Sequence, residues 1–272
     1  MTSILSNIAA QSASRQLNSK SSGLQKTIQR LTTGKPIKSA SDEDADDAAG
    51  LATSSKLGAD ARIAAQGRRN ANDGLALLQT ADGVLDEVTN LLTRAADLAQ
   101  QAASDTSGPD GGPGKTALDA EFQKIITTLG DLEGKTTFNS ASVFGGGAVS
   151  VSVGGSASVD VTVGTFHSLS AMKDKLTTAA QAGTAATDIA SALDKVSALR
   201  EAITANQERL QGISNSLGIQ VENFTAAFSQ ITDANVANEV VNLSKFQILN
   251  QSGISALGQA SSSAQSILAL LR

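Results

Sequence analysis

The sequence predicts a mainly α-helical protein in which long antiparallel helices form a coiled-coil rod, with one small β-hairpin region in the middle of the chain. Two long stretches repeat apolar residues at alternating spacings of three and four, the heptad pattern of helices that pack along one another. Aromatic residues make up only 3% of the 272 residues, and Trp, Tyr and Cys are absent. Small residues and leucine at heptad spacing suit close helix packing better than a globular core.

The longest heptad pattern runs from residue 189 to residue 231. One series is apolar throughout: Ile189, Val196, Ile203, Leu210, Leu217, Phe224 and Ile231. The other is apolar at its ends and polar in its middle: Leu193, then Arg200, Gln207 and Ser214, then Val221 and Phe228. We therefore expect the partner helix to present polar or small side chains opposite this middle part, or no side chains at all. A straight helix of this length spans roughly 60 Å, which favours a rod over a globule.

A second strict heptad begins at Leu78 and is the natural partner of the first. Its two series are Leu78, Leu85, Leu92 and Ala99, and Ala81, Val88, Ala95 and Ala102. Residues 107–114, which contain Pro109 and Pro113, predict a turn, and a further helix is expected over residues 117–132.

Valines alternate with small polar residues over 149–153 and again over 159–163, with Gly154 and Gly155 between the two runs. This period of two around a glycine pair predicts a β-hairpin. Helix is expected to resume near Leu169.

Both chain ends carry slender apolar stripes on otherwise polar helices. The first helix is broken by Gly34 and Pro36, after which Ser41 predicts the N-cap of the next helix. Because stripes this thin leave the ends short of partners, we expect them to become ordered against other copies of the chain. The predicted self-assembly residues are Ile4, Ile8, Leu17, Leu24, Ile28, Leu31, Val236, Val240, Leu243, Phe246, Leu249, Leu257, Leu268 and Leu271.

Composition argues against several classes of partner. The formal net charge is −5 and no basic face with interleaved aromatics exists, so nucleic acid is not an expected partner. No apolar run reaches the ~18 residues of a membrane span, so no membrane partner is expected. The first residues lack a charged segment and a long apolar core, so no cleavable signal peptide is predicted.

No constellation of residues predicts catalysis, a cofactor or a metal. Gly114-Lys115-Thr116 imitates the end of a phosphate-binding loop, but Pro109 stands where that loop requires glycine. The acidic residues between Asp42 and Asp47 match no calcium loop and are better explained as helix capping and a solvated face. His167 is the only histidine, and no nucleophile motif accompanies it. The chain is therefore predicted not to be an enzyme.

Several different short motifs follow one another in order along the chain, most of them toward its two ends. They are Arg30-Leu31-Thr32-Thr33-Gly34, Asp46-Asp47-Ala48-Ala49-Gly50, Arg69-Asn70-Ala71-Asn72-Asp73-Gly74, Gln79-Thr80-Ala81-Asp82-Gly83, Thr137-Phe138-Asn139, Gln247-Ile248-Leu249-Asn250-Gln251 and Ile267-Leu268-Ala269-Leu270-Leu271-Arg272. Taken together they resemble bacterial flagellin, over nearly the whole chain.

The resemblance implies a structural subunit that polymerises into the flagellar filament for swimming motility. It implies a discontinuous filament-core domain of terminal helices, residues 1–42 and 234–272, and a helical-rod domain, residues 43–233, with the hairpin at about 135–166. The family's variable outer region would be reduced here to that hairpin, which assembly would then not require. The location implied is extracellular, in the filament, after type III export without a cleavable signal peptide.

The resemblance also implies partners. They are other copies of the chain in a homopolymer, a flagellar export chaperone, and hook-associated and cap proteins. Toll-like receptor 5, a vertebrate innate receptor, recognises the family around residues 91–101. Here Arg94, Leu98 and Gln101 match the family pattern, but Ala96 replaces a common arginine, which implies weakened recognition.

Two alternative functions remain open on the sequence. A hook–filament junction protein shares similar terminal helices but caps a structure instead of extending it. A flagellin-like binding protein of the cell surface would recognise polysaccharide or a host receptor. Unlimited polymerisation of the purified protein separates the first alternative from a filament subunit, and saturable binding by the monomer would support the second.

Overall fold

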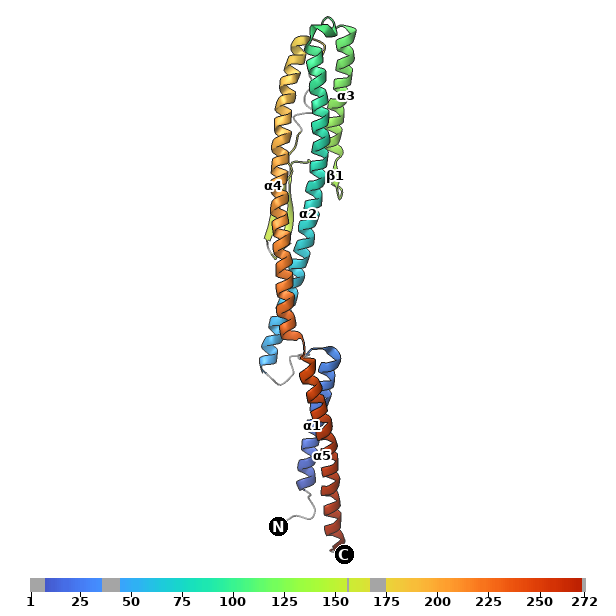
Figure 1. Cartoon of the computed structure of the whole chain (residues 1–272), viewed down its shortest axis with the longest axis vertical. Coiled ribbons are helices and arrows are strands. Elements are labelled where there is room, and N and C mark those ends of the chain that lie inside the picture. The colour runs from blue at the N-terminus through green and yellow to red at the C-terminus, as the bar shows by residue number, and fades with distance from the viewer. Residues whose placement is uncertain (1–7, 36–44, 156, 167–174, 271–272) are drawn as a thin grey trace. The chain divides into compact units, whose positions relative to one another are not determined.

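The computed structural model describes residues 8–35, 45–155, 157–166 and 175–270 (Figure 1). The long helices of this part are α1 (Ile8–Thr33), α2 (Ala45–Ala103), α3 (Pro113–Lys135), α4 (Ala179–Thr232) and α5 (Val236–Leu270). The chain separates into two compact units, which we call the terminal unit (residues 1–59 and 224–272) and the central unit (residues 60–223). The domain boundaries expected at residues 42/43 and 233/234 concern the assembled filament and stay a prediction.

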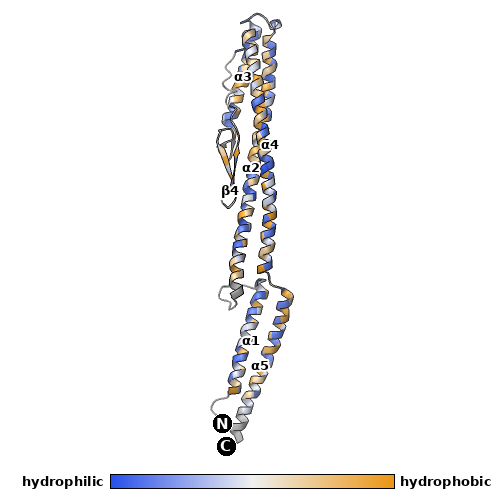
Figure 2. Cartoon of the chain, turned by 90° about the vertical axis from the view of Figure 1, so that its left-hand side faces the viewer, coloured by the Kyte–Doolittle hydropathy of each residue, from blue (hydrophilic) through white to orange (hydrophobic). Residues whose placement is uncertain are grey.

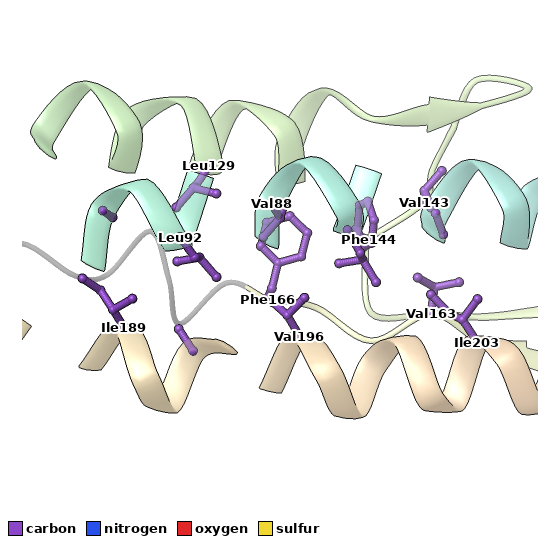
Figure 3. Packing of buried hydrophobic residues seen from close by; sticks show 14 of the residues in the cluster. Val88, Leu92, Leu129, Val143, Phe144, Val163, Phe166, Ile189, Val196 and Ile203 are labelled. Carbon is purple, nitrogen blue, oxygen red and sulfur yellow. The ribbon is translucent and has the colours of Figure 1, made fainter. Parts of the chain in front are cut away.

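The core of the central unit is the predicted pair of heptad stretches. On α2, all eight residues of the two heptad series are 0% exposed. On α4, the apolar series is buried from Ile189 to Leu217. Figure 3 shows side chains of the two helices, such as Leu92 and Ile189, turned toward one another. The prediction that these two stretches pack together is confirmed.

Polar contacts hold the two helices together where the second α4 series is polar. Arg200 donates from Nε to Asp82 Oδ1 at 3.0 Å and from a terminal nitrogen to Asp86 Oδ1 at 3.2 Å. Farther along, the Ser214 hydroxyl donates to the Asn72 side-chain oxygen at 2.9 Å. The α2 number falls as the α4 number rises, so the helices are antiparallel. The expected polar partner is confirmed at Arg200 and at Ser214.

Helix α3 packs a third apolar face onto this core. Its buried apolar residues are Phe122, Ile125, Ile126 and Leu129. Pro113 occupies the first turn of α3, where a residue without a backbone N–H leaves no helical hydrogen bond unmade. A short 3-10 turn (Asp105–Ser107) connects α2 to the loop before α3.

The middle of the chain forms two hairpins rather than one. Strands β1 (Thr137–Phe138) and β2 (Ala141–Ser142) pair around Asn139 and Ser140, whose φ angles are 49° and 66°. This small hairpin lacks an alternating run of β-branched residues, so the sequence pattern did not reveal it. The predicted hairpin consists of β3 (Ala148–Gly154) and β4 (Ala157–Thr162), with Val149 opposite Val161 and Val151 opposite Val159.

The β3–β4 hairpin belongs to the core of the central unit. Val151, Val159, Val161 and Val163 are all buried. Just before and after the hairpin, Phe144 and Phe166 meet edge to face with ring centroids 4.9 Å apart, between α2 and α4 (Figure 3). Its valines fill space between the helices, so the hairpin is part of this core. The expectation that assembly does not require the hairpin stays a prediction.

Glycines on α2 allow the hairpin to approach this closely. A Cβ atom on Gly67 would lie 2.4 Å from the backbone oxygen of Val153, and one on Gly74 would lie 3.0 Å from Val151 and 3.1 Å from Leu210. Between them, the Asn70 side-chain amide donates to the Ser152 carbonyl at 2.8 Å. The two glycines thus leave space on this face of α2 for the strand to pack against the helix backbone.

Helix α4 begins later than the sequence suggested. Leu169 lies outside the described residues, and residues 175–178 are not helical. The Thr178 hydroxyl accepts from the Gln181 N–H at 3.2 Å, as an N-cap does. Leu176 is buried, and its N–H donates to Asp119 at 2.8 Å. Leu176 thus fills the core from a segment that is not helical.

Candidate self-assembly surface

In the terminal unit, α1 and α5 pack antiparallel as a two-helix pair. Two glycines mark the closest approaches. A Cβ atom on Gly23 would lie 2.9 Å from the ring of Phe246, and one on Gly253 would lie 3.0 Å from Leu17. Small residues on one helix opposite large ones on the other bring the backbones together while leaving little apolar surface buried.

Backbone hydrogen bonds fix one end of this pair. Gly34, with a φ of +68°, donates to the Arg30 carbonyl at 2.8 Å, and its own carbonyl accepts from the Ala234 N–H at 2.8 Å. The Asn235 side chain then accepts from the Asn238 N–H at 3.2 Å and caps α5. A left-handed glycine after the last helical turn is the usual way to end a helix, so Gly34 ends α1 as predicted.

One ion pair connects the helices near this end. An Arg30 terminal nitrogen lies 3.7 Å from Glu239 Oε1. Glu239 is only 8% exposed, and within the described part of the chain its other carboxylate oxygen has no hydrogen-bond partner. The pair is therefore loose and not a bidentate clamp.

The terminal unit has no hydrophobic core of its own among the described residues. No apolar side chain of α1 or α5 is fully buried there, whereas the central unit buries a continuous cluster. Of the ten large hydrophobic residues that are exposed in the described ranges, eight lie on α1 or α5, and the other two are Ile63 and Ile219. A soluble protein leaves such a surface open mainly where something else covers it.

The predicted self-assembly residues divide into two groups in the structure. Those half-buried between the helices are Leu17, Leu24, Leu31, Leu243, Phe246 and Leu257. Those exposed are Ile8, Ile28, Val236, Val240 and Leu249. Ile4 and Leu271 lie outside the described residues, as does the side chain of Leu268.

Three further exposed residues were missed, namely Val241, Ile248 and Ile254. Val241 and Ile248 lie on the side of α5 opposite Phe246, and Ile254 falls in the gap that the prediction leaves between Leu249 and Leu257. The sequence does contain a signal for them, because no charged residue occurs between Phe246 and Leu271. A helix without charged side chains can be enclosed by neighbours on several sides without desolvating an ion. Figure 2 shows hydrophobic residues along the length of this helix pair.

The comparisons with known proteins identify the family. Residues 4–148 match the bacterial flagellin N-terminal helical region, and residues 186–271 match the bacterial flagellin C-terminal helical region. The chain belongs to the bacterial flagellin family. It is accordingly a structural subunit of a flagellar filament and not an enzyme.

Relatives match along nearly the whole chain. A flagellin of Halalkalibacterium halodurans is 33% identical over 275 residues, covering 98% of both chains. The flagellar filament 30.7 kDa core protein of Treponema maltophilum is 30% identical, covering 97% of this chain and 98% of its own. Among solved structures, a Bacillus cereus flagellin matches with a TM-score of 0.50 at 26% identity, over 55% of this chain and 88% of its own.

The residues suggested for receptor contact do not share one surface. Leu98 is 1% exposed, in the core of the central unit. Arg94 is exposed and pairs with Glu121 at 2.8 Å, and Gln101 is exposed. Only Arg94 and Gln101 therefore offer side chains to a partner of the folded unit.

The phosphate-loop look-alike is a structural contact. Lys115 is 1% exposed, and its ammonium donates to Asp110 Oδ1 at 2.8 Å. The same oxygen accepts from the Ala179 N–H at 3.1 Å, while the Gly111 N–H donates to the Thr177 carbonyl at 2.8 Å. These bonds fasten the turn before α3 to the start of α4, which leaves Lys115 no freedom to hold a phosphate.

No candidate metal or membrane element is found in the part of the chain that the structure describes. No group of three or more potential metal-ligating side chains gathers among those residues. None of their helices has the length and hydropathy to cross a bilayer. His167 and Asp42–Asp44 lie outside the described ranges, and the side chains of Asp46 and Asp47 do as well.

Proposed function

We propose that the α1–α5 pair is the surface through which this filament subunit polymerises. The observation that carries the proposal is that no apolar side chain of the pair is fully buried among the described residues, while eight large ones are exposed. Burying an exposed aliphatic side chain contributes about 1.5–3 kcal/mol, so neighbouring copies supply the missing core.

The kind of contact follows from the placement of these residues. The exposed residues of α5 lie on more than one side of the helix, so a single partner cannot cover them all. Contacts between unlike faces of identical subunits do not close, and they generate a helical fibre when repeated. The terminal helices then act as the filament core, and residues 43–233 form the domain outside it.

The central unit suits a different mechanical role. Its helices share a continuous hydrophobic core, to which the β3–β4 hairpin contributes its buried valines. Interiors packed this densely have low compressibility. A unit of this kind transmits torque along the fibre, which propulsion requires.

The same exposed surface implies further partners. Before assembly, the apolar residues of α5 need cover, which an export chaperone provides. At the two ends of the filament, the last subunits lack a neighbouring copy on one side. Their exposed α1–α5 surface contacts the hook-associated and cap proteins instead. The working location of the assembled subunit is extracellular. Recognition by Toll-like receptor 5 would involve Arg94 and Gln101, with Leu98 reachable only if α2 separates from the core.

Truncation tests the proposal directly. Removal of residues 1–35, or of residues 235–272, is expected to abolish filaments seen by electron microscopy while the helical circular dichroism of the central unit persists. Long filaments from either truncated protein would refute the assignment. Filaments of unlimited length from the purified full chain would distinguish a filament subunit from a junction protein, which stops at a cap.

A further inference from the structure

The chain contains the dipeptide Asn-Ser three times, in three different places of the fold. Asn139-Ser140 forms the turn between β1 and β2, Asn215-Ser216 lies in the interior of α4, and Asn18-Ser19 lies on α1. Asparagine is a chemically labile residue, because the backbone nitrogen of the next residue can attack its side-chain amide. Since the attacking residue is serine in all three places, differences between them report the effect of the fold.

The β1–β2 turn leaves both reacting groups of its Asn-Ser dipeptide open to water. Asn139 and Ser140 are exposed, and their φ angles of 49° and 66° lie in the left-handed region that residues other than glycine seldom adopt. The strands pair on either side of them, with Phe138 opposite Ala141. Among the residues that the structure describes, no backbone hydrogen bond uses the Ser140 N–H. That nitrogen therefore breaks no hydrogen bond when it attacks.

The Asn-Ser dipeptide of α4 has the same exposure but a different backbone. Asn215 and Ser216 are both exposed on the helix surface. Inside a helix each N–H donates to the carbonyl four residues earlier, which occupies the Ser216 N–H. The Asn215 side-chain oxygen also accepts from Gln211 Nε2 at 3.1 Å. An attack there requires local opening of a helix that packs on the core of the central unit.

We propose that Asn139 is a site of spontaneous chemical modification, with water as the only co-reactant. The Ser140 nitrogen bonds to the side-chain carbonyl carbon of Asn139, its proton passes through solvent to the departing amide nitrogen, and ammonia leaves. Water then opens the resulting cyclic succinimide at one of its two carbonyls. Opening gives aspartate, or isoaspartate in which the main chain runs through the former side chain.

The modification changes the hairpin in two ways. Either product adds a negative charge at position 139. Isoaspartate also lengthens the main chain of a two-residue turn, which disturbs the pairing of Phe138 with Ala141. Phe138 packs against the core of the central unit, and Val143 and Phe144 just beyond β2 are buried in it. We therefore expect the isoaspartate form to show faster amide exchange over residues 137–142.

Peptide mass spectrometry of the full chain, incubated at mildly alkaline pH, measures the rate of amide loss at each asparagine. Asn139 is expected to react at least about tenfold faster than Asn215, because opening a packed helix costs more than about 1.4 kcal/mol. Asn215 is the matched control, since α1, which contains Asn18, is expected to open readily in the monomer. In urea, where no backbone is held, the rates at Asn139 and Asn215 should become similar. Equal rates in the folded chain, or a difference that persists in urea, overturn the inference.

Ser140→Gly provides a second measurement on the folded chain. Glycine adopts a positive φ without strain and has no side chain to obstruct the attack, so this variant keeps the turn and exposes the nitrogen further. The rate of amide loss at Asn139 is expected to rise several-fold, while the rate at Asn215 stays the same. An unchanged rate at Asn139 would show that the Ser140 nitrogen is not the attacking group and would overturn the inference.

Discussion

Large aliphatic residues differ widely in importance in this chain, depending on whether the fold buries them. Leu92 is 0% exposed and packs inside the central unit, whereas Ile219 on α4 is 61% exposed. The energetic consequence of truncating a side chain follows its burial, because removing buried atoms costs both transfer free energy and a cavity.

Leu92→Ala is expected to lower the free energy of unfolding of the central unit by about 2–5 kcal/mol. Ile219→Ala is the matched control and is expected to change it by less than about 0.5 kcal/mol, since the side chain is already in water. Urea unfolding followed by helical circular dichroism measures both. Comparable losses in the two variants would show that the core does not lie where the heptads place it.

The turn before α3 gives a pH dependence at the residue scale. The hydrogen bond from the Lys115 ammonium, followed by the Ala179 N–H, holds the pKa of the Asp110 carboxyl below its usual value of 3.8. A lowered pKa means that the folded state favours the ionised carboxylate. The stabilisation from Asp110 is therefore complete above its unfolded pKa and is lost as the pH falls through the folded one.

Asp110→Asn is expected to lower the Tm near pH 6, because Lys115 then lies buried without its counter-charge. The difference in Tm between the wild type and this variant should shrink as the pH is taken from 6 to 2. A thermal scan at each pH measures it. A difference that stays constant over this range would mean that the carboxylate does not fasten the turn.

At the scale of elements, the β3–β4 hairpin is held by the face of α2 that contains Gly67. The contact is between a helix and a strand backbone, and a single methyl group would occupy the space that the Val153 carbonyl now fills. Since glycine is intrinsically unfavourable in a helix, its presence at such a position reflects the close approach.

Gly67→Ala is expected to destabilise the central unit by about 1–3 kcal/mol, because the hairpin has to move outward. Gly83→Ala, on the same helix, meets nothing within 4 Å and is expected to stabilise it by up to about 1 kcal/mol through helix propensity. Denaturant unfolding of the two variants gives the comparison. Stabilisation by both substitutions would mean that the hairpin does not rest on α2.

Elements with a strong apolar periodicity could be predicted from the sequence. Elements whose position depends on contacts between segments far apart in the sequence could not. The heptads around Leu85 and Val196 specify both the helices and their pairing, because a stripe of this kind has one way to be buried. The position of the hairpin on α2 depends on the close approach of Gly67 to a strand more than eighty residues away in the sequence. No local pattern encodes such a contact. The start of α4 could not be predicted for the same reason, as Leu176 fills the core from a segment that is not helical.

The candidate site was predictable only on one side of its helices. Leu24 and Leu243 follow the stripe that joins α1 to α5, and the sequence shows it. Val241 and Ile248 lie on the opposite side of α5, so a search for one apolar face overlooks them. The neutral run after Phe246 is a signal of a different kind, namely a helix enclosed by more than one neighbour.

At the scale of the whole molecule, the chain combines a central unit with a complete core and a terminal unit without one. Leu249→Asp tests this division, because Leu249 is exposed in the single chain and lines a groove between α1 and α5. A carboxylate there remains solvated in the monomer but would be desolvated on assembly. We expect filaments to disappear from electron micrographs while the unfolding of the central unit is unchanged. Ile219→Asp, also at an exposed position but outside the terminal unit, is the control. Normal filaments from Leu249→Asp would contradict the assignment.

The dependence of the terminal helices on neighbouring copies is tested most directly by amide hydrogen exchange on the monomer and on the filament. Amides of α1 and α5 are expected to exchange quickly in the monomer, because little side-chain burial opposes local opening, and slowly in the filament. Amides of the central unit should be protected to the same degree in both. Equal protection of α1 and α5 in the monomer and the filament would contradict the account, because the terminal helices would then be stable without other copies.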